Sequence, residues 1–207
     1  MGGTAEQGSD AYYYEKPTHR VTLSSYYIGE TEVTQALWQA VMGNNPSNWK
    51  GSNLPVEQVS WEDCQNFVRE LNRMTGKNFR LPTEAEWEFA ARGGNKSTGC
   101  KYSGSNAIDN VAWCGSNSEL KTHDVKTKSP NELGIYDMSG NAWEWCQDWK
   151  GDYSSYPQTN PTGPSSGLNR VNRGGCWGNY ANGCRSSYRF SFTPSYRGSN
   201  LGLRLAL

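Results

Sequence analysis

The sequence predicts one α+β domain covering residues 1–207, in which two to three helices are followed by many short strands and long loops. Helical periodicity is confined to the part of the chain before residue 95. Beyond that point Gly, Asn, Ser and Pro punctuate short apolar pieces, which is typical of short strands joined by turns. Nine Trp and twelve Tyr accompany only 19% charged residues. We therefore expect a core that depends on aromatic side chains.

The beginning of the chain contains one predicted strand and one short predicted helix. Residues 1–18 are polar and are expected to form a loose end. Residues 19–28 alternate apolar and polar side chains, as a strand does. Residues 34–42 are expected to form a helix, with Thr34 as its N-cap and Gly43 just past its end.

Two further helices are predicted before the character of the chain changes. Residues 60–75 give the clearest signal, because apolar side chains recur there at spacings of three and four, between Ser60 as N-cap and Gly76. The next helix begins after Thr83, which forms a capping box with Glu86. We interpret the three Glu residues at its start as compensation of the helix dipole.

The second half of the chain is expected to consist of short strands and loops. Residues 143–149 form a short apolar piece, and residues 150–169 are rich in Ser, Pro, Gly and Asn, as a long surface loop is. Residues 169–207 alternate short extended pieces with turns. No fixed-period repeat divides the chain.

Charge and hydropathy exclude several classes of function. Twenty Lys and Arg balance twenty Asp and Glu, so there is no global basic field for nucleic acid. No apolar run of about 18 residues occurs, so no membrane span is predicted. The first residues lack the basic and apolar regions of a signal peptide. We expect an intracellular or virion-borne protein, or one whose leader is not part of this chain.

The cysteines and histidines do not predict a zinc site or a nucleophile with its base. Six cysteines occur without a CxxC pair, and the only histidines are His19 and His123. These two histidines are isolated in the sequence, so a Ser/His/Asp or Cys/His arrangement has no support beyond residue types. A chain of this length does not need disulfides to stabilise its core.

Six motifs occur in order along almost the whole chain. They are YIGETEVT at 27–34, PVEQVSWED at 55–63, RLPTEAEWEFAARGG at 80–94, GIYDMSGNAWEW at 134–145, RGG at 173–175 and NLGLR at 200–204. In these motifs the chain resembles the formylglycine-generating-enzyme family, also called sulfatase-modifying factors. The resemblance implies a C-type lectin fold of the formylglycine-generating-enzyme type, which is α+β and loop-rich with short antiparallel strands. It does not fix the activity, because one fold serves enzymes and binders.

The catalytic residues of that family are not matched. Its enzymes use two cysteines, about five positions apart after the Arg-Gly-Gly motif, to hold copper, which favours thiolate ligands. In this chain Cys176 and Cys184 are eight apart, and Asn179 and Ala181 align nearest to the two enzymatic cysteines. We therefore expect no catalytic residues and no enzyme activity. The alternative is a copper-dependent formylglycine-generating oxidase that acts on a sulfatase cysteine.

Residues 174–199 have the composition of an antibody paratope. Five Gly, five Ser, three Tyr and two Asn account for most of this segment, and almost nothing aliphatic remains. Tyr and Trp supply rigid contact area there, whereas Ser, Gly and Asn supply adaptable hydrogen bonds. On composition alone, a glycine-rich loop that closes the fold is an equal alternative.

The same segment resembles the variable region of the variable proteins of diversity-generating retroelements. The matching motifs are RGGxW from residue 173, CRSSYR from 184, TPSxR from 193 and NLGLRLAL from 200. In those systems template adenines are randomised on copying, so that an AAC codon becomes Tyr, Ser, Gly, Phe, Cys, Thr or Asp. The resemblance implies a variable ligand-binding region within 174–199. Its diversified positions are Cys176, Gly178, Asn179, Tyr180, Asn182, Gly183, Phe190, Ser191, Phe192, Tyr196 and Gly198.

The residues between these positions are interpreted as a fixed scaffold. They are Trp177, Ala181, Arg185, Tyr188, Arg189, Thr193 and Pro194. Phe190 and Phe192 lie two apart on an expected extended segment and so share a face. They are either an exposed pair beside Tyr180 and Tyr196 or two core residues.

The function that follows is non-enzymatic binding and display. We expect a retroelement-diversified, receptor-binding protein whose partner is a protein or glycan on a cell or virion surface. Its expected location is a phage virion or a bacterial cell surface. A surface domain without diversification is a further alternative.

The resemblance also implies a calcium loop in residues 137–144. By motif position Asp137 and Glu144 supply carboxylate oxygens, and Gly140 and Ala142 supply backbone carbonyls, which are the hard ligands that calcium prefers. In the alternative, Asn141 and Glu144 hydrogen-bond the loop without metal. Binding modules of this fold often lack metal, so we expect no required cofactor.

Overall fold

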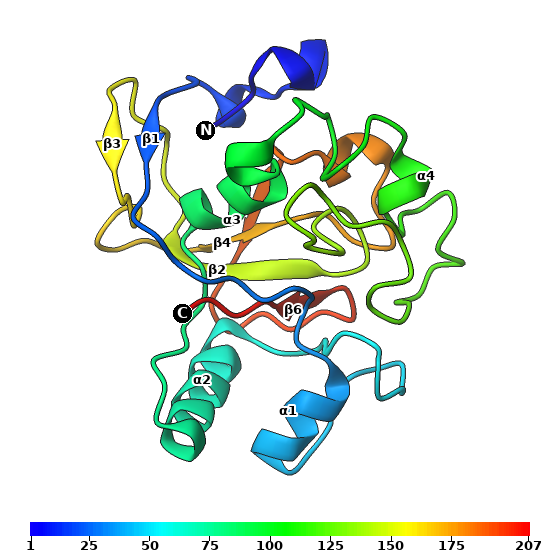
Figure 1. Ribbon diagram of the computed structural model, residues 1–207. Helices are drawn as coiled ribbons and strands as arrows, with labels where there is room; N and C mark the ends of the chain where they lie inside the picture. The colour runs from blue at the N-terminus through cyan, green and yellow to red at the C-terminus, as the bar shows by residue number, and fades with distance from the viewer.

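A four-stranded sheet forms the centre of the molecule (Figure 1). The computed structural model describes residues 1–7 and 11–207 with their side chains and residues 8–10 by their backbone. The strand order is β5–β4–β2–β6. The strands are β2 (Trp143–Trp149), β4 (Arg170–Arg173), β5 (Arg189–Phe192) and β6 (Leu201–Leu203).

The expectation of antiparallel strands holds for only part of this sheet. β4 runs antiparallel to both β2 and β5, whereas β6 runs parallel to β2. The cause is the connection from β5, which must pass β4 and β2 within residues 193–200, so that β6 enters the sheet in the direction of β5. The predicted strand at 19–28 is interrupted. β1 (Val21–Thr22) pairs in parallel with β3 (Gln158–Thr159), and Ile28 forms an isolated antiparallel bridge with Ala206.

The three predicted helices form at the predicted places. They are α1 (Gln35–Met42), α2 (Trp61–Thr75) and α3 (Glu84–Ala91), and α4 (Ile108–Val111) is a single turn that the sequence does not predict. The side chains of Thr34, Ser60 and Thr83 accept the expected N-cap hydrogen bonds. Four 3₁₀ segments complete the set: η1 (Ala5–Asp10), η2 (Tyr13–Glu15), η3 (Gly94–Lys96) and η4 (Ala181–Cys184). None of the helices in the described part of the chain has the length and apolar character of a membrane span.

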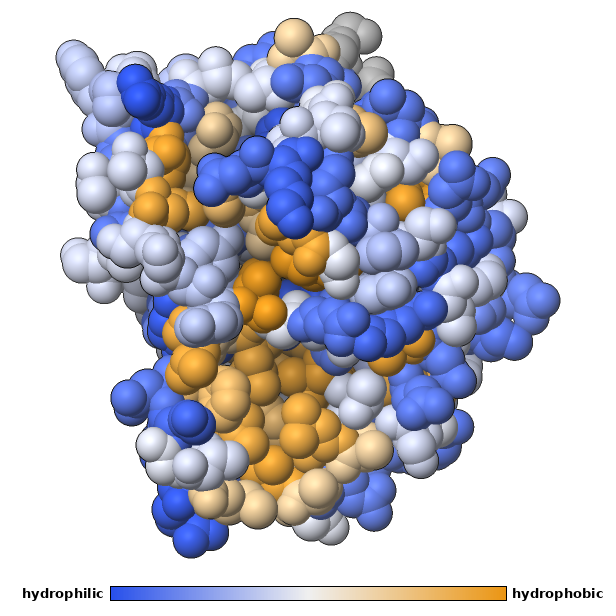
Figure 2. Space-filling model, in the orientation of Figure 1, coloured by the Kyte–Doolittle hydropathy of each residue, from blue (hydrophilic) through white to orange (hydrophobic). Residues whose placement is uncertain are grey.

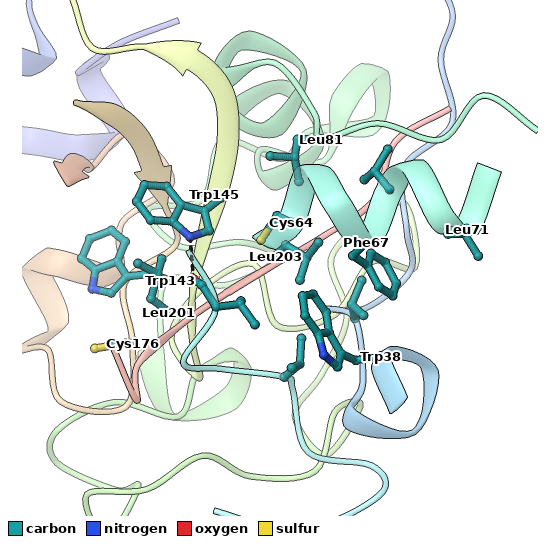
Figure 3. Close-up of a cluster of buried hydrophobic side chains, with 14 residues drawn as sticks. Trp38, Cys64, Phe67, Leu71, Leu81, Trp143, Trp145, Cys176, Leu201 and Leu203 are labelled. Atoms are coloured by element: carbon teal, nitrogen blue, oxygen red, sulfur yellow. Dashed lines mark hydrogen bonds between the residues drawn. The ribbon is translucent and has the colours of Figure 1, made fainter. Parts of the chain in front are cut away.

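Helices cover the sheet on two sides, α3 on one and α1 with α2 on the other (Figure 1). Below the sheet the aromatic core joins α1 and α2 to β2 and β6 (Figure 3). Trp38 stacks on Phe67 with ring centroids 4.8 Å apart, and the Trp145 indole donates to the Val59 carbonyl at 3.0 Å. The expectation of an aromatic core is therefore confirmed.

The N-terminal segment is not the loose end that its polarity suggests. Gln7, Ala11 and Glu15 are buried, and the Gly3 amide donates to the Glu15 carbonyl at 2.9 Å. The Glu15 carboxylate is paired with Arg185, 170 residues further along the chain. The described residues on either side of 8–10 are thus held by a tertiary contact that a local reading of the sequence does not reveal.

Buried Arg–Glu pairs connect the last part of the chain to the rest. Arg173, Arg185, Arg189 and Arg204 are all buried and pair with Glu88, Glu15, Glu84 and Glu144, respectively. Two of these glutamates lie on α3, where the sequence suggested a role in compensating the helix dipole. Their carboxylates are instead the partners of arginines on β4 and β5.

An apolar region is exposed over α1 and α2 on the face shown in Figure 2. Leu37 on α1 and Met74 on α2 are among the exposed apolar side chains of these two helices. Nothing in the described chain shows what covers this region, so we assign it no function.

Candidate ligand-binding surface

The predicted variable positions lie on three segments that follow β4. These segments are the loop 176–183 with η4, strand β5, and the crossover 193–200 that leads into β6. The exposed positions are Gly178, Tyr180, Asn182, Phe190 and Tyr196; Asn179, Ser191 and Phe192 are half-buried; Cys176, Gly183 and Gly198 are buried. Eight of the eleven positions are therefore accessible in this chain.

Strand β5 separates a buried side from an accessible side. Arg189 is buried and its guanidinium Nε donates to Glu84 at 2.6 Å, whereas the next residue, Phe190, is 42% exposed. Phe192 shares the face of Phe190, as the spacing predicts, and packs partly against the core. The pair is thus neither fully exposed nor fully buried.

Aromatic contacts join β5 to the crossover. Phe190 meets Phe192 edge-on with ring centroids 5.1 Å apart, and Phe192 stacks on Tyr196 at 4.1 Å. On its other side Phe190 lies 6.0 Å from the buried Trp143 ring. Two clusters of predicted positions, separated in the sequence, therefore form one aromatic surface.

Hydrogen bonds between its own residues hold the loop 176–183 in shape. The Cys176 thiol donates to the Asn179 Oδ1 atom at 3.0 Å and accepts from the Gly178 amide at 3.4 Å. This inward anchoring leaves the tip of the loop accessible, and Tyr180 is 87% exposed.

The interpreted scaffold residue Trp177 fixes this loop to the crossover. Its indole Nε1 donates to the Ser199 carbonyl at 3.1 Å, and its ring meets Trp49 edge-on at 5.2 Å. The Trp177 amide also donates to the Asn141 carbonyl at 2.8 Å. The indole N–H, the ring and the backbone amide of Trp177 therefore each attach the loop to a segment outside it.

Three residues beside this surface were missed by the sequence reasoning. They are Tyr12 and Tyr14, which pack against Tyr188 and against each other, and Tyr13, which packs against Tyr14. The available signal was a run of three tyrosines inside a stretch that is otherwise polar. The polar residues around this run predict a loose end, so the sequence gives no reason to expect these rings to pack.

Cys176 and Cys184, the two cysteines of the region 174–199, are both buried. The six thiols are free, and Cys184 packs with Cys114 and also has Cys176 as a neighbour. Burial raises the pKa of both the Cys176 and the Cys184 thiols. Protonated thiols are poor ligands for soft metals and poor nucleophiles.

In the predicted calcium loop, Glu144 is already paired with a cation. It is fully buried, and its Oε1 atom accepts from Arg204 Nη2 at 2.8 Å. Its Oε2 atom accepts from Arg204 Nε at 3.0 Å and from the Trp87 indole at 2.6 Å. The Arg204 guanidinium therefore supplies the positive charge beside this carboxylate.

Of the other predicted calcium ligands, the Asp137 carboxylate also accepts a hydrogen bond from the protein, and the backbone amides of Gly140 and Ala142 are hydrogen-bonded. Asp137 is buried and its Oδ2 atom accepts from the Lys126 amide at 2.9 Å, while the Ala142 amide donates to Glu32 at 2.9 Å. The Gly140 amide donates to the Gly174 carbonyl. No three His, Cys, Asp or Glu side chains among the described residues are grouped as a metal site requires. The calcium loop stays a prediction, with the Arg204 guanidinium already paired with Glu144.

We expect calcium to leave the thermal stability of the protein unchanged. An ion that binds only the folded state raises Tm, and Arg204 occupies the position of the countercharge here. The measurement is a melting curve in millimolar CaCl2 against one in EGTA, with MgCl2 as control. A Tm rise specific to calcium contradicts this expectation and supports the site at Asp137 and Glu144.

A family model and known proteins both match most of this chain. The family model of the sulfatase-modifying factor enzyme 1-like domain matches residues 1–207. Chaperone protein LppX of Paenibacillus barcinonensis is 36% identical over 98% of this chain and 86% of its own length. The formylglycine-generating enzyme of Streptomyces coelicolor is 37% identical over 84% of this chain, which spans only 59% of that enzyme.

One solved structure is similar to this chain in both fold and sequence. Treponema denticola variable protein 1 is 40% identical, with a TM-score of 0.86 over 91% of this chain and 86% of that chain.

Proposed function

We propose that this chain, which belongs to the family of sulfatase-modifying factor enzyme 1-like domains, is a non-enzymatic member that displays a ligand-binding surface. The fold is the C-type lectin fold of the formylglycine-generating-enzyme type, as predicted. The likeness to a variable protein favours a binding role, and the likeness to formylglycine-generating enzymes keeps the oxidase as the second candidate. In the proposed role, the C-terminal region 174–199 contacts the ligand.

The observation that carries this proposal is that eight of the eleven predicted diversified positions are accessible, whereas two arginines of the interpreted scaffold are buried between them. The predicted diversified residues Tyr180, Phe190 and Tyr196 are exposed, whereas the interpreted scaffold residues Arg185 and Arg189 between them are buried and ion-paired. A binding surface that changes between copies needs this division, because substitutions at accessible positions away from packed contacts cost little stability.

The proposed partner is a protein or glycan on the surface of another cell or virion. Exposed Tyr, Phe and Asn supply both large apolar contacts and hydrogen bonds, as binding hot spots do. We propose display on a phage virion or a bacterial cell surface.

The source DNA tests the diversification. We expect a near-copy of codons 170–207 downstream of the gene, with adenines at the diversified positions, and a reverse transcriptase gene nearby. Sister copies that differ elsewhere but agree at these positions would contradict the proposal.

A matched pair of tyrosine variants tests the division into surface and scaffold. We expect Tyr180→Ser to change the free energy of unfolding by less than about 0.5 kcal/mol, because its side chain is exposed. Tyr188→Ser is expected to cost about 2 kcal/mol or more, since its ring contacts Tyr12, Tyr14 and Trp143. Urea denaturation measures both. Equal losses in the two variants argue against the division.

Copper(I) binding distinguishes the oxidase alternative from the proposed binding role. The two thiols nearest the enzymatic positions are buried, with raised pKa values, so we expect no stoichiometric copper(I) binding. A one-to-one copper(I) complex that is lost in Cys176→Ser or Cys184→Ser supports the oxidase instead.

A further inference from the structure

Three consecutive tyrosines form a cluster of packed rings near the N-terminus. Tyr12 stacks on Tyr14 with ring centroids 5.3 Å apart, and Tyr13 meets Tyr14 edge-on at 5.2 Å. Tyr13 is 84% exposed and Tyr12 is 40% exposed. We call these three residues the tyrosine ledge.

Packed aromatic rings connect the ledge to the candidate surface through the buried Trp143. Tyr12 and Tyr14 meet Tyr188 edge-on at 5.7 and 6.0 Å, and Tyr188 lies 5.9 Å from Trp143. Trp143 in turn contacts Phe190. Ring contacts therefore run without a break from Tyr13 to the aromatic residues of β5 and the crossover.

A hydrogen bond joins the ledge to the other predicted cluster as well. The Asn182 amide Nδ2 atom donates to the Tyr12 hydroxyl at 2.9 Å. Asn182 is an exposed, predicted diversified position in η4. The ledge thus touches both the loop 176–183 and, through Tyr188 and Trp143, strand β5.

The ledge is held rigidly by the residue that follows it. Glu15 is fully buried, receives two hydrogen bonds from the Arg185 guanidinium, and accepts from the Tyr12 amide at 3.0 Å. Rigid aromatic side chains lose little conformational entropy on binding, so they contribute more of their contact area to affinity.

We propose that the tyrosine ledge is a constant part of the ligand-binding surface and contacts the same ligand as the variable region. This inference rests on the proposed function. Because residues 12–14 lie outside 174–199, they are the same whatever sequence the variable region carries. Each variant would then share one aromatic contact and differ in the others.

The occupant that fits this combined surface is a folded protein. None of the eleven predicted positions carries a charge, and the ledge adds only phenol groups. Uncharged Tyr, Phe and Asn side chains complement the neutral amide and apolar surface at the centre of protein interfaces. The surface also extends over several chain segments, which suits a broad protein epitope better than a single sugar ring.

Selection of new binders from a display library tests the ledge without knowledge of the natural ligand. The full chain is displayed on yeast, with the eight accessible predicted positions randomised, and is selected against hen lysozyme and, in a second arm, against immobilised mannan. Purified lysozyme binders then receive Tyr13→Ala or, as a matched control, Tyr156→Ala. Tyr156 is also exposed, at 76%, and has no ring contact with the surface.

We expect Tyr13→Ala to raise the Kd for lysozyme about tenfold in most independent binders, and Tyr156→Ala to leave it within about twofold. If binders arise but Tyr13→Ala leaves all their Kd values unchanged, the ledge is not part of the surface, although the proposed function stands. Binders to mannan alone overturn the protein occupant. If neither target yields binders, the proposed function fails, and the inference fails with it.

Discussion

Arg185→Met is expected to destabilise the protein by about 3–5 kcal/mol, because it leaves a carboxylate buried without its partner. Arg185 and Glu15 are both fully buried, and the guanidinium Nη2 and Nη1 atoms donate to the two Glu15 oxygens at 2.6 and 2.8 Å. Urea denaturation measures the loss. Limited proteolysis should also show faster cleavage within residues 1–18, which this pair holds in place.

The pH dependence of this effect has a definite sign. Burial alone raises the pKa of Glu15, but the hydrogen bonds from Arg185 and Ser187 hold it below its usual value. A lowered folded-state pKa contributes stability above the unfolded pKa, and this stability is lost as the pH falls through the folded pKa. We therefore expect Arg185→Met to lose more stability at pH 7 than at pH 4.

A double variant separates the charge from the packing. Glu15→Leu combined with Arg185→Met removes both charges, and we expect it to recover most of the stability, since apolar pairs often replace buried ion pairs without loss. If Arg185→Met alone lowers the free energy of unfolding by less than about 1 kcal/mol, the ion pair with Arg185 is not what offsets the cost of burying the Glu15 carboxylate.

Arg204→Met is expected to have an effect of similar size, about 3–5 kcal/mol, measured in the same way. Arg204 is fully buried and donates to Glu144, to the Gly29 carbonyl at 2.8 Å and to the Tyr136 carbonyl at 2.7 Å. Its loss leaves one carboxylate and two carbonyls short of a donor in the interior. The residue follows β6 directly, so the variant also weakens the attachment of that strand.

The matched control is another Arg–carboxylate pair at the surface. Arg197 pairs with Asp63 at 2.7 Å, and about half of its side chain is accessible. Arg197→Met is expected to cost no more than about 1 kcal/mol, because exposed ion pairs are screened by water and salt. Equal effects of Arg197→Met and Arg204→Met would mean that burial does not set the strength of these pairs.

The sequence predicts the helices well because their signals are local. Thr34, Ser60 and Thr83 cap helices through hydrogen bonds that reach only three residues along the chain. The direction of β6 depends instead on how residues 193–200 cross the sheet. No short-range pattern encodes that path, so the expectation of antiparallel strands fails there.

The candidate surface shows the same boundary between local and tertiary information. The resemblance to retroelement variable proteins predicts which positions of residues 174–199 differ between copies, and the alternation along β5 places Phe190 and Phe192 on one face. Sequence reasoning cannot tell that Cys176 points into its own loop. It also misses the tyrosine ledge, which reaches the surface from the opposite end of the chain.

By itself, the sequence determined the family, the fold class, the aromatic core and the three main helices, because motifs, periodicity and caps are written in neighbouring residues. Only the tertiary structure decided which charges are buried, which predicted positions are accessible and what lies beside them. The pairing of Glu15 with Arg185 spans 170 residues. Contacts at that separation depend on the folded path of the whole chain, and the same path brings the tyrosine ledge to the proposed binding surface.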